Sequence, residues 1–484
     1  MRLIKHSIYN LLGLGLPLVV AVFSIPLLIK GLGDARFGLL TLIWALVSYF
    51  GLFDLGLGRA LTQELASILD GPKHKYSGQV VVTSLILMLA LGFFASGIIF
   101  MFAPIGMRYI KSILDYQEAI NSVYIISVGM PFILLTSGFR GILEAKHHFG
   151  IINAIRLPMG IFTFLGPLLV VLYFDSSLEM IALVLVVGRI LACIIHGWYA
   201  WLAVSSFHGK LSFNKKLLKP LCFSGGWMTV SNVISPLMGY VDRFIIGFTI
   251  SAAAVAFYTT PQEIVTKLWI IPGALTAVLF PTFASQIFKN KAEVRRIFYL
   301  SINIIFLSVT PIALCLILFS NEILSIWINK NFASNSQIYL KIFAIGILIN
   351  CMAHIPYTLI QGTGNSKITA QFHLIQAPIY FGLLWLLTMK YGVLGASIAW
   401  LLRMLFDAVM MFVGSYRLMK WPISDLIKSN FVLYSFVITP VIVGGIYFDL
   451  SLTLRLFVEI LLVISSLFLL FGIVSKHHAN QIKY

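Results

Sequence analysis

The sequence predicts an all-α integral membrane protein that crosses the lipid bilayer about fourteen times. Two features of composition predict this fold class, since 60% of the 484 residues are hydrophobic and only 11% are charged, against roughly a quarter charged in a typical soluble domain. The third observation is a series of apolar runs near the ~20 residues that a spanning helix needs. A soluble protein of this length could not bury so much apolar surface.

Each expected span is an apolar run that ends at polar or small residues. The longest stretch between two runs covers about residues 205–221, which leaves no segment long enough for a soluble domain. We expect the first run to be a retained helix, because no small-residue cleavage site closes it. The runs fall at about 8–29, 38–58, 80–102, 120–143, 153–174, 179–204, 222–249, 254–285, 297–319, 338–361, 371–389, 393–416, 431–448 and 454–475.

Positive charge gives the expected orientation. With the N-terminus in the cytoplasm and the spans alternating, 21 of the 34 Lys and Arg residues lie in cytoplasmic segments, 8 lie on the opposite side and 5 lie inside spans. Cytoplasmic loops of membrane proteins are enriched in these residues. We therefore expect both termini to be cytoplasmic, and the net charge of +17 reflects this bias.

A faint internal repeat predicts the domain organisation. The fourth and tenth expected spans end in similar turns, GILEAKHHFG and QGTGNSKITAQFH, and RILACII from Arg189 resembles RMLFDAV from Arg403. Both matches are about six spans apart, so the copies point the same way and predict two lobes with a site between them. Chance similarity of apolar helices is the alternative. The expected parts are a first lobe over 1–208, a second lobe over 209–420, and two extra helices with a cytoplasmic tail over 421–484.

Proline gathers in the eighth expected span, at Pro261, Pro272 and Pro281. Proline removes a backbone hydrogen bond and kinks a helix. The eighth span is therefore expected to be bent, although proline is common in membrane helices in general.

Ten charged residues lie inside the expected spans. A charge at the bilayer centre costs about 2.5–3.5 kcal/mol on insertion scales, so these side chains should form pairs or face water. The bases are Arg140, Arg189, Arg243, Lys267 and Arg403, and the acids are Asp54, Asp242, Glu263, Asp407 and Glu459.

Spacing separates these charges into two kinds. Glu263 and Lys267 are four residues apart, as are Arg403 and Asp407, so each pair can neutralise itself on one helix face. The alternative is that one pair breaks when a proton or ligand binds. Arg189 has no other charged residue from position 185 to 193. It must find a partner on another helix or an anionic ligand, which makes it the strongest single candidate.

A partly desolvated cationic cavity suits a phosphate-bearing ligand, because guanidinium groups bind phosphate oxygens in bidentate fashion. Aromatic side chains in the spans could offer faces to sugar rings, but such residues more often serve in packing; they are Trp44, Tyr49, Trp227, Tyr240, Tyr258 and Trp269. The expected ligand-binding bases are Arg189, Arg403, Lys267, Arg243, Arg59 and Arg140. The expected coupling or charge-pair acids are Asp242, Glu263, Asp407 and Asp54.

Several classes of function are disfavoured. Nucleic-acid binding would need a solvated basic face that no segment can form. The four cysteines show no CxxC spacing and read as buried apolar residues, and the two His-His pairs sit at basic, loop-like positions, so no metal site or cofactor is expected. The chain has no GxxxxGK[ST] phosphate-binding loop. It also lacks a DxD motif and a long external loop, which argues against an enzyme such as a membrane glycosyltransferase, polymerase or ligase.

The stretch GLGDARFGLLTLIWALVSYFGLFDLGLGRALTQELA, residues 31–66, resembles the start of bacterial polysaccharide exporters of the Wzx type. The segment YVDRFIIG, residues 240–247, is similar to their seventh-helix motif. Asp54 and Arg59 match the family's second-helix region, and Asp242 and Arg243 match the seventh. Chain length, span count and basic charge also fit over the whole chain.

This resemblance implies two six-helix lobes around a central cavity, often with two further helices. It also implies movement of an undecaprenyl-pyrophosphate-linked oligosaccharide from the cytoplasmic to the periplasmic leaflet of the bacterial inner membrane. The implied mechanism is alternating access, coupled to an ion such as H⁺ or Na⁺, and polysaccharide polymerase machinery is a further implied partner. A multidrug or cation antiporter and a lipid II flippase are the related alternatives, although a cation carrier should favour carboxylates in its cavity.

Overall fold

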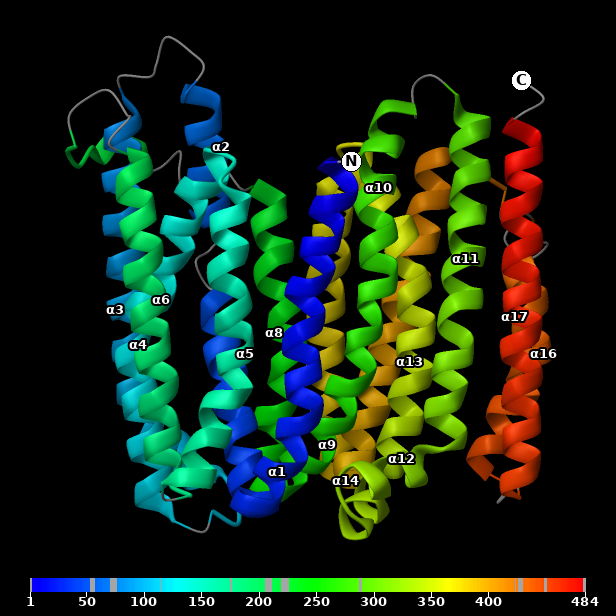
Figure 1. Cartoon of the computed structure of the whole chain (residues 1–484), viewed down its shortest axis with the longest axis horizontal. Helices are drawn as coiled ribbons and strands as arrows, with labels where there is room; N and C mark the ends of the chain where they lie inside the picture. Colours follow the sequence, from blue (N-terminus) through cyan, green and yellow to red (C-terminus); the bar gives the residue numbers. More distant parts are fainter. Residues whose placement is uncertain are drawn as a thin grey trace. The chain divides into compact units, whose positions relative to one another are not determined.

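The computed structural model describes residues 2–52, 57–69, 76–113, 115–174, 176–204, 211–218, 226–286, 290–422, 424, 430–447 and 451–481 (Figure 1). All regular structure in these ranges is helical. Lipid offers no hydrogen bonds to the chain, so apolar side chains and internally hydrogen-bonded backbones are favoured. Helices meet both requirements. The predicted all-α membrane fold is confirmed.

Within the described ranges, ten stretches are long and apolar enough to cross a membrane. Seven of the helices that contain them make one crossing each and coincide with expected spans. Asparagine or aspartate caps several of their N-termini, as Asp115 does by accepting hydrogen bonds from two backbone N–H groups of α4. These seven helices are α3 (Ser77–Tyr109), α4 (Tyr116–Ala145), α5 (Phe149–Tyr173), α6 (Leu178–Val204), α11 (Lys291–Leu318), α13 (Lys330–Gly362) and α17 (Leu452–Gln481).

Two further stretches each contain two crossings. Helix α14 (Ser366–Met419) has 54 residues, which as a straight rod would be about 80 Å long, far beyond a hydrocarbon core of about 30 Å. It turns at Gly392, whose φ is 61°, and α1 (Arg2–Leu52) turns in the same way at Gly33, whose φ is 75°. Glycine adopts positive φ without steric cost. Each helix is therefore a pair of legs, and the legs match expected spans 1, 2, 11 and 12.

The eighth expected span is bent, as its prolines predict. It consists of α9 (Ala252–Thr266), the 3₁₀ segment η3 (Lys267–Trp269) and α10 (Ile270–Gln286). A 3₁₀ stretch in the middle of a helix is a site of altered geometry and often a hinge. Helices α8 (Gly226–Thr249) and α16 (Asn430–Tyr447) correspond to expected spans 7 and 13. The other elements are α2 (Leu57–Leu69), η2 (Lys215–Leu217) and α12 (Ser320–Trp327).

The chain forms two compact units, Met1–Ala256 and Phe257–Tyr484. In the first unit α4 packs between α3 and α6, while α1 packs on α5, α4 and α8 (Figure 1). In the second unit α13 packs on α14, α11, α10 and α12, and α11 also contacts α16 and α17. Helix α8 thus belongs to the first unit by its packing, whereas the expected lobe boundary precedes it. The division at 208/209 remains a prediction about the repeat.

At one end of the first unit, the backbones of α1 and α9 approach each other closely. The second leg of α1 meets the start of α9 at Gly38, where an added Cβ would lie 1.8 Å from the carbonyl oxygen of Ala252. The turn after α3 joins the same region, because the backbone of Lys111 accepts from Ala252 N at 3.1 Å and donates to Gly247 O at 3.2 Å. The loops at this end therefore hold α1, α3, α8 and α9 together.

Two ties attach the last helices to the second unit. Lys341 of α13 donates to the carbonyl of Gly445 in α16 at 2.9 Å. Arg455 of α17 donates to Leu318 O at 2.8 Å and pairs with Glu322 of α12 at 2.8 Å. Both extra helices are therefore held by basic side chains as well as by apolar packing.

Candidate functional site

Arg189 lies in the middle of helix α6 of the first unit and is partly exposed. It is 11 residues from the start of α6, or about 16 Å along the helix axis. This places it near the middle of a hydrocarbon core about 30 Å thick. Its side chain lines a small cavity, called here the arginine cavity. The other lining residues come from α1, α4, α5 and α6 and are Trp44, Val47, Ile126, Ile133, Thr163, Leu185 and Val186.

No described residue pairs with the Arg189 guanidinium: no ion pair, hydrogen bond or aromatic contact to it occurs within the described ranges. The indole N–H of Trp44 is also buried, and no described residue accepts a hydrogen bond from it. Thr163, on the same wall, directs its hydroxyl to Met159 O at 2.9 Å. The cavity therefore holds donors that lack acceptors, and it holds no carboxylate. Such a donor set suits an anion.

A second and larger cavity lies next along the same helices. It is lined almost entirely by apolar side chains, and we call it the apolar chamber. Ile126 lines both cavities, and Ile43 of the chamber is adjacent in α1 to Trp44 of the arginine cavity. The chamber's one hydroxyl, on Ser122, donates to Glu118 O at 2.8 Å. Its walls are Leu39, Leu42, Ile43, Leu46, Met107, Ala119, Ser122, Val123, Ile126, Leu178 and Phe244.

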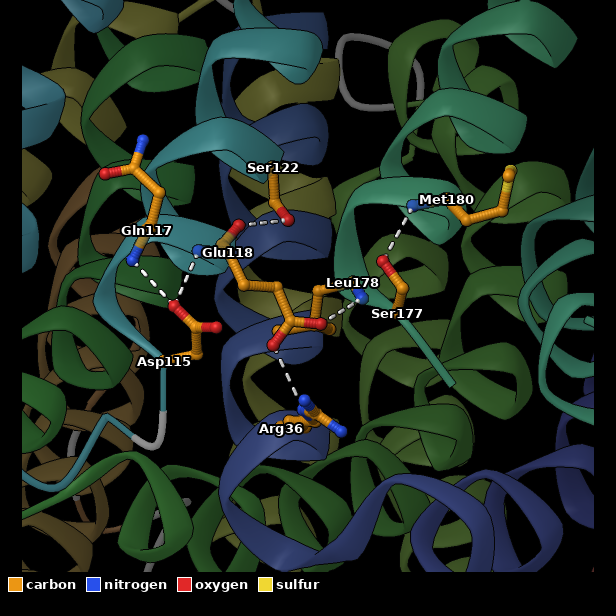
Figure 2. Close-up of polar contacts among 8 residues, drawn as sticks. All are labelled: Arg36, Asp115, Gln117, Glu118, Ser122, Ser177, Leu178 and Met180. Carbon is orange, nitrogen blue, oxygen red and sulfur yellow. Dashed lines mark hydrogen bonds and ion pairs between the residues drawn. The ribbon is translucent and has the colours of Figure 1, made fainter. Parts of the chain in front are cut away.

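A polar cluster occupies the helix ends beside the chamber (Figure 2). Glu118, in the first turn of α4, accepts from Arg36 Nε at 3.0 Å and from the backbone N–H of Leu178 at 2.8 Å. Asp115 accepts from the N–H groups of Gln117 and Glu118 and so caps α4. This Arg36–Glu118 cluster joins α1, α4 and α6. The sequence search for charges inside spans missed it, because both residues lie just outside the apolar runs.

Asp242 and Arg243 lie in α8 and are almost completely buried, with 0% and 6% of their surfaces exposed. The Asp242 carboxylate accepts from the backbone N–H of Arg243 at 2.8 Å. The Arg243 guanidinium lies over the ring of Tyr240, 5.3 Å from its centroid. Asp242 and Arg243 are therefore in contact inside the first unit. Arg140, another predicted site residue, is half-exposed and pairs with Glu144 at 3.5 Å.

The second unit has its own buried polar cluster around Asp407 in the second leg of α14. Asn350 of α13 donates to the Asp407 carboxylate at 3.1 Å and accepts from Trp269 Nε1 at 2.9 Å. His373 Nε2 lies 3.9 Å from the same carboxylate, and the other ring nitrogen, Nδ1, is buried without a hydrogen-bond partner. Because Asn350 and His373 are formally neutral, a search for charged residues could not find them. An asparagine and a histidine inside apolar runs were the available signal.

Arg403 precedes Asp407 by one turn. Its guanidinium lies over the ring of Tyr380, 5.2 Å from the centroid, and its backbone carbonyl accepts from Gln376 Nε2 at 3.0 Å. The groups around the Asp407 carboxylate thus come from α13 and from the first leg of α14. The sequence had predicted Arg403 alone as its partner.

The other expected pair, Glu263 and Lys267, is in contact. The Lys267 ammonium lies 2.9 Å from the Glu263 carboxylate, and both side chains are more than a third exposed. This geometry is that of the self-neutralising pair that the spacing allowed. Asp54 and the side chain of Arg59 lie outside the described residues.

Comparison with known proteins gives consistent matches. The model of the family described as polysaccharide biosynthesis protein matches residues 3–287, and the MatE family model matches residues 228–386. A Shigella flexneri protein named "Putative O-antigen transporter" is 33% identical over 414 residues, 85% of this chain and 97% of the relative. A Salmonella typhi protein of the same name is 24% identical over 388 residues, 78% and 87% of the two chains.

Solved structures show the same fold. An inward-facing multidrug resistance transporter of the MATE family and the MOP superfamily superposes with a TM-score of 0.74 at 13% identity, covering 85% of this chain and 98% of that one. The lipid II flippase MurJ, in an inward closed conformation, gives a TM-score of 0.68 at 18% identity over 99% of this chain and 100% of that one. At these identities the likeness concerns the fold alone.

Proposed function

Because this chain belongs to the polysaccharide biosynthesis protein family, we propose that it moves an undecaprenyl-pyrophosphate-linked oligosaccharide from the cytoplasmic to the periplasmic leaflet of the inner membrane. The coarser conclusion, a multi-pass membrane protein with a flippase role in polysaccharide biosynthesis, follows from the family, the O-antigen transporter relatives and the fold. The resemblance expected from residues 31–66 is confirmed.

The observation that carries the finer proposal is Arg189, whose guanidinium has no partner among the residues that the structure describes. A partly buried guanidinium without an acceptor is costly, and an intramembrane charge with no structural partner is typical of a substrate or ion pathway. A pyrophosphate supplies the missing acceptors, since it offers several anionic oxygens to Arg189 and to the Trp44 N–H. A cation, the substrate of the antiporter alternative, would find only donors in this cavity.

Alternating access and orientation form part of the same proposal. The charge bias supports cytoplasmic termini, and the bend at η3 gives the second unit a segment that can change geometry. We propose that H⁺ or Na⁺ drives the cycle at Asp407, because this carboxylate is only 21% exposed and lies against the formally neutral side chains of Asn350 and His373. The response of transport to an imposed proton or sodium gradient measures this coupling.

Gene deletion tests the function itself. In a strain that lacks this protein, lipid-linked oligosaccharide repeats should accumulate in the cytoplasmic leaflet, and surface polysaccharide should be lost. The wild-type gene should restore it, as should the Arg296→Ala variant, whose exposed guanidinium pairs with Glu293 at 2.9 Å and serves as a control. Unchanged polysaccharide with altered drug sensitivity would instead favour the antiporter. Trapped peptidoglycan precursor would favour a lipid II flippase.

A further inference from the structure

An indole N–H in the second unit fixes the orientation of the Asn350 side chain. Trp269 Nε1 donates to Asn350 Oδ1 at 2.9 Å. Because an indole N–H can only donate, the amide must turn its carbonyl oxygen toward the indole. The amide nitrogen then faces the other way and donates to Asp407 Oδ2 at 3.1 Å. Asn350 therefore meets the carboxylate with a donor and not with an oxygen.

The indole and the amide are both held in place. Trp269 is the last residue of η3, at the bend of the eighth span, and its ring centroid lies 6.3 Å from that of His354. His354 follows Asn350 by one turn of α13. Only 7% of Asn350 is exposed, so a rotated amide would lose the indole's hydrogen bond with little water to replace it. The orientation of the amide is therefore set by packing between η3 and α13.

The other groups around Asp407 are also nitrogen donors or bases. His373, on the first leg of α14, lies on the side of the second carboxylate oxygen, with Nε2 3.9 Å from Oδ1. Arg403 brings a positive charge one turn earlier on the same helix, and its guanidinium lies over the ring of Tyr380. The backbone carbonyl of Arg403 already accepts from Gln376 Nε2 at 3.0 Å. The carboxylate thus lies among nitrogen donors, and the oxygens of Asn350 and Arg403 already accept hydrogen bonds.

These surroundings fit a proton better than a sodium ion. Sodium is a hard cation that needs several oxygen ligands in place of its water shell. The Asn350 oxygen points away from Asp407, and Arg403 repels a second cation. Within the part of the chain that the structure describes, no three His, Cys, Asp or Glu side chains lie close enough together to hold a metal ion. A proton needs only one lone pair, and Asp407 Oδ1 offers one because Asn350 bonds to Oδ2.

We propose that the coupling ion at Asp407 is H⁺ and that Trp269, acting through Asn350, is the residue that excludes Na⁺. The proton forms an O–H bond at Oδ1, on the side of His373, and its release restores the carboxylate with no other bond changed. Trp269 does not touch the ion and is a positioning residue. This inference rests on the proposed function, because it chooses between the two ions named there.

Ion binding by the purified full-length protein tests the choice of ion. Infrared difference spectra between high and low pH should show a carboxylic acid C=O band that Asp407→Asn removes. Radioactive sodium should show no saturable binding that depends on Asp407. Saturable sodium binding that Asp407→Asn abolishes, or the absence of a titrating carboxyl band, would overturn the proposal.

Variants of Trp269 test the origin of the selectivity. Trp269→Phe removes the N–H and frees the amide to turn its oxygen toward Asp407, so sodium should bind about tenfold more tightly than to the wild type, the change expected for one hydrogen bond. Trp269→His keeps a ring N–H and should behave as the wild type. Trp385→Phe, at a ring that is 51% exposed on α14, is the control.

A change at Asn350 keeps the test informative if Trp269→Phe does not fold. Asn350→Asp places an oxygen beside Asp407 in either orientation of the side chain, and it should also bind sodium about tenfold more tightly than the wild type. Sodium binding that stays at the wild-type level in both folded variants would remove Trp269 and Asn350 from ion selection.

The outcome is separable from that of the proposed function. If the deletion strain loses surface polysaccharide but the wild-type protein binds sodium at Asp407, only the choice of ion is wrong. If the carboxyl band and the sodium measurements come out as expected but the deletion strain has normal polysaccharide, the flippase assignment is wrong and the proton site serves another transport role.

Discussion

Arg36 and Arg189 lie in the same unit, the first in the Arg36–Glu118 cluster at the helix ends and the second at the arginine cavity, and their surroundings differ. Arg36 donates to Glu118, which also accepts a backbone N–H at the start of α6. Arg189 has no such partner among the described residues. The first charge is part of the architecture at the helix ends. We propose that the second charge binds a ligand, so the presence or absence of a partner among the described residues would distinguish scaffold from site within one bundle.

Removing Arg189 should give the largest functional effect. Arg189→Ala should lower transport by about a hundredfold, since a hydrogen bond to a charged group contributes about 1.5–3 kcal/mol and 1.4 kcal/mol corresponds to tenfold. The same variant should keep or raise thermal stability, because a partly buried charge with no partner among the described residues is removed. Reconstituted vesicles and a thermal unfolding curve measure the two quantities. Normal transport, or a large loss of stability, would contradict the distinction between Arg189 as a site residue and Arg36 as a scaffold residue.

Removing Glu118 should have the opposite profile. Glu118→Ala leaves Arg36 and the Leu178 N–H without their acceptor, and it should destabilise the protein by about 2 kcal/mol, within the range for an unsatisfied partly buried group. Transport per folded molecule should fall much less than in Arg189→Ala. Thermal unfolding in detergent measures the loss. Glu144→Ala, which breaks the half-exposed pair with Arg140, should cost under about 1 kcal/mol and serves as the control.

Changing Asp407 should have the smallest effect on folding and a specific effect on coupling. Asp407→Asn keeps the shape and one acceptor oxygen for Asn350, so the stability change should stay within about 1 kcal/mol. Transport should no longer respond to an imposed ion gradient, although exchange at equilibrium persists. Arg296→Ala, at an exposed pair, should leave this response intact. A retained gradient response in Asp407→Asn would place the coupling group elsewhere.

The fold was predictable because apolar runs of spanning length leave few alternatives in lipid. Even the two tight turns were visible, since the expected spans stop at 29 and 389 and resume at 38 and 393. The bend of the eighth span could be predicted from Pro261 and Pro272. The exact position of the 3₁₀ segment could not, because it depends on packing.

The site was only partly predictable. The isolation of Arg189 along its own helix could be read from the sequence, but whether the described residues of other helices offer it a partner depends on the tertiary structure. Conversely, Glu118 lay outside the runs where charge seemed costly, and Asn350 and His373 carry no formal charge. Their importance comes from which helices meet, and a single sequence with a faint repeat does not specify that.

The turns at Gly33 and Gly392 have a consequence for how the chain enters the membrane. Each joins two hydrophobic legs through a short segment, residues 30–37 around Gly33 and 390–392 around Gly392, so one leg has little slack in which to wait at the surface while the other inserts. The legs must partition into the bilayer together, as preformed hairpins whose backbones are already hydrogen-bonded. A bulky or charged tag placed at either glycine would therefore hinder biogenesis of both legs at once, well before any effect on the mature protein.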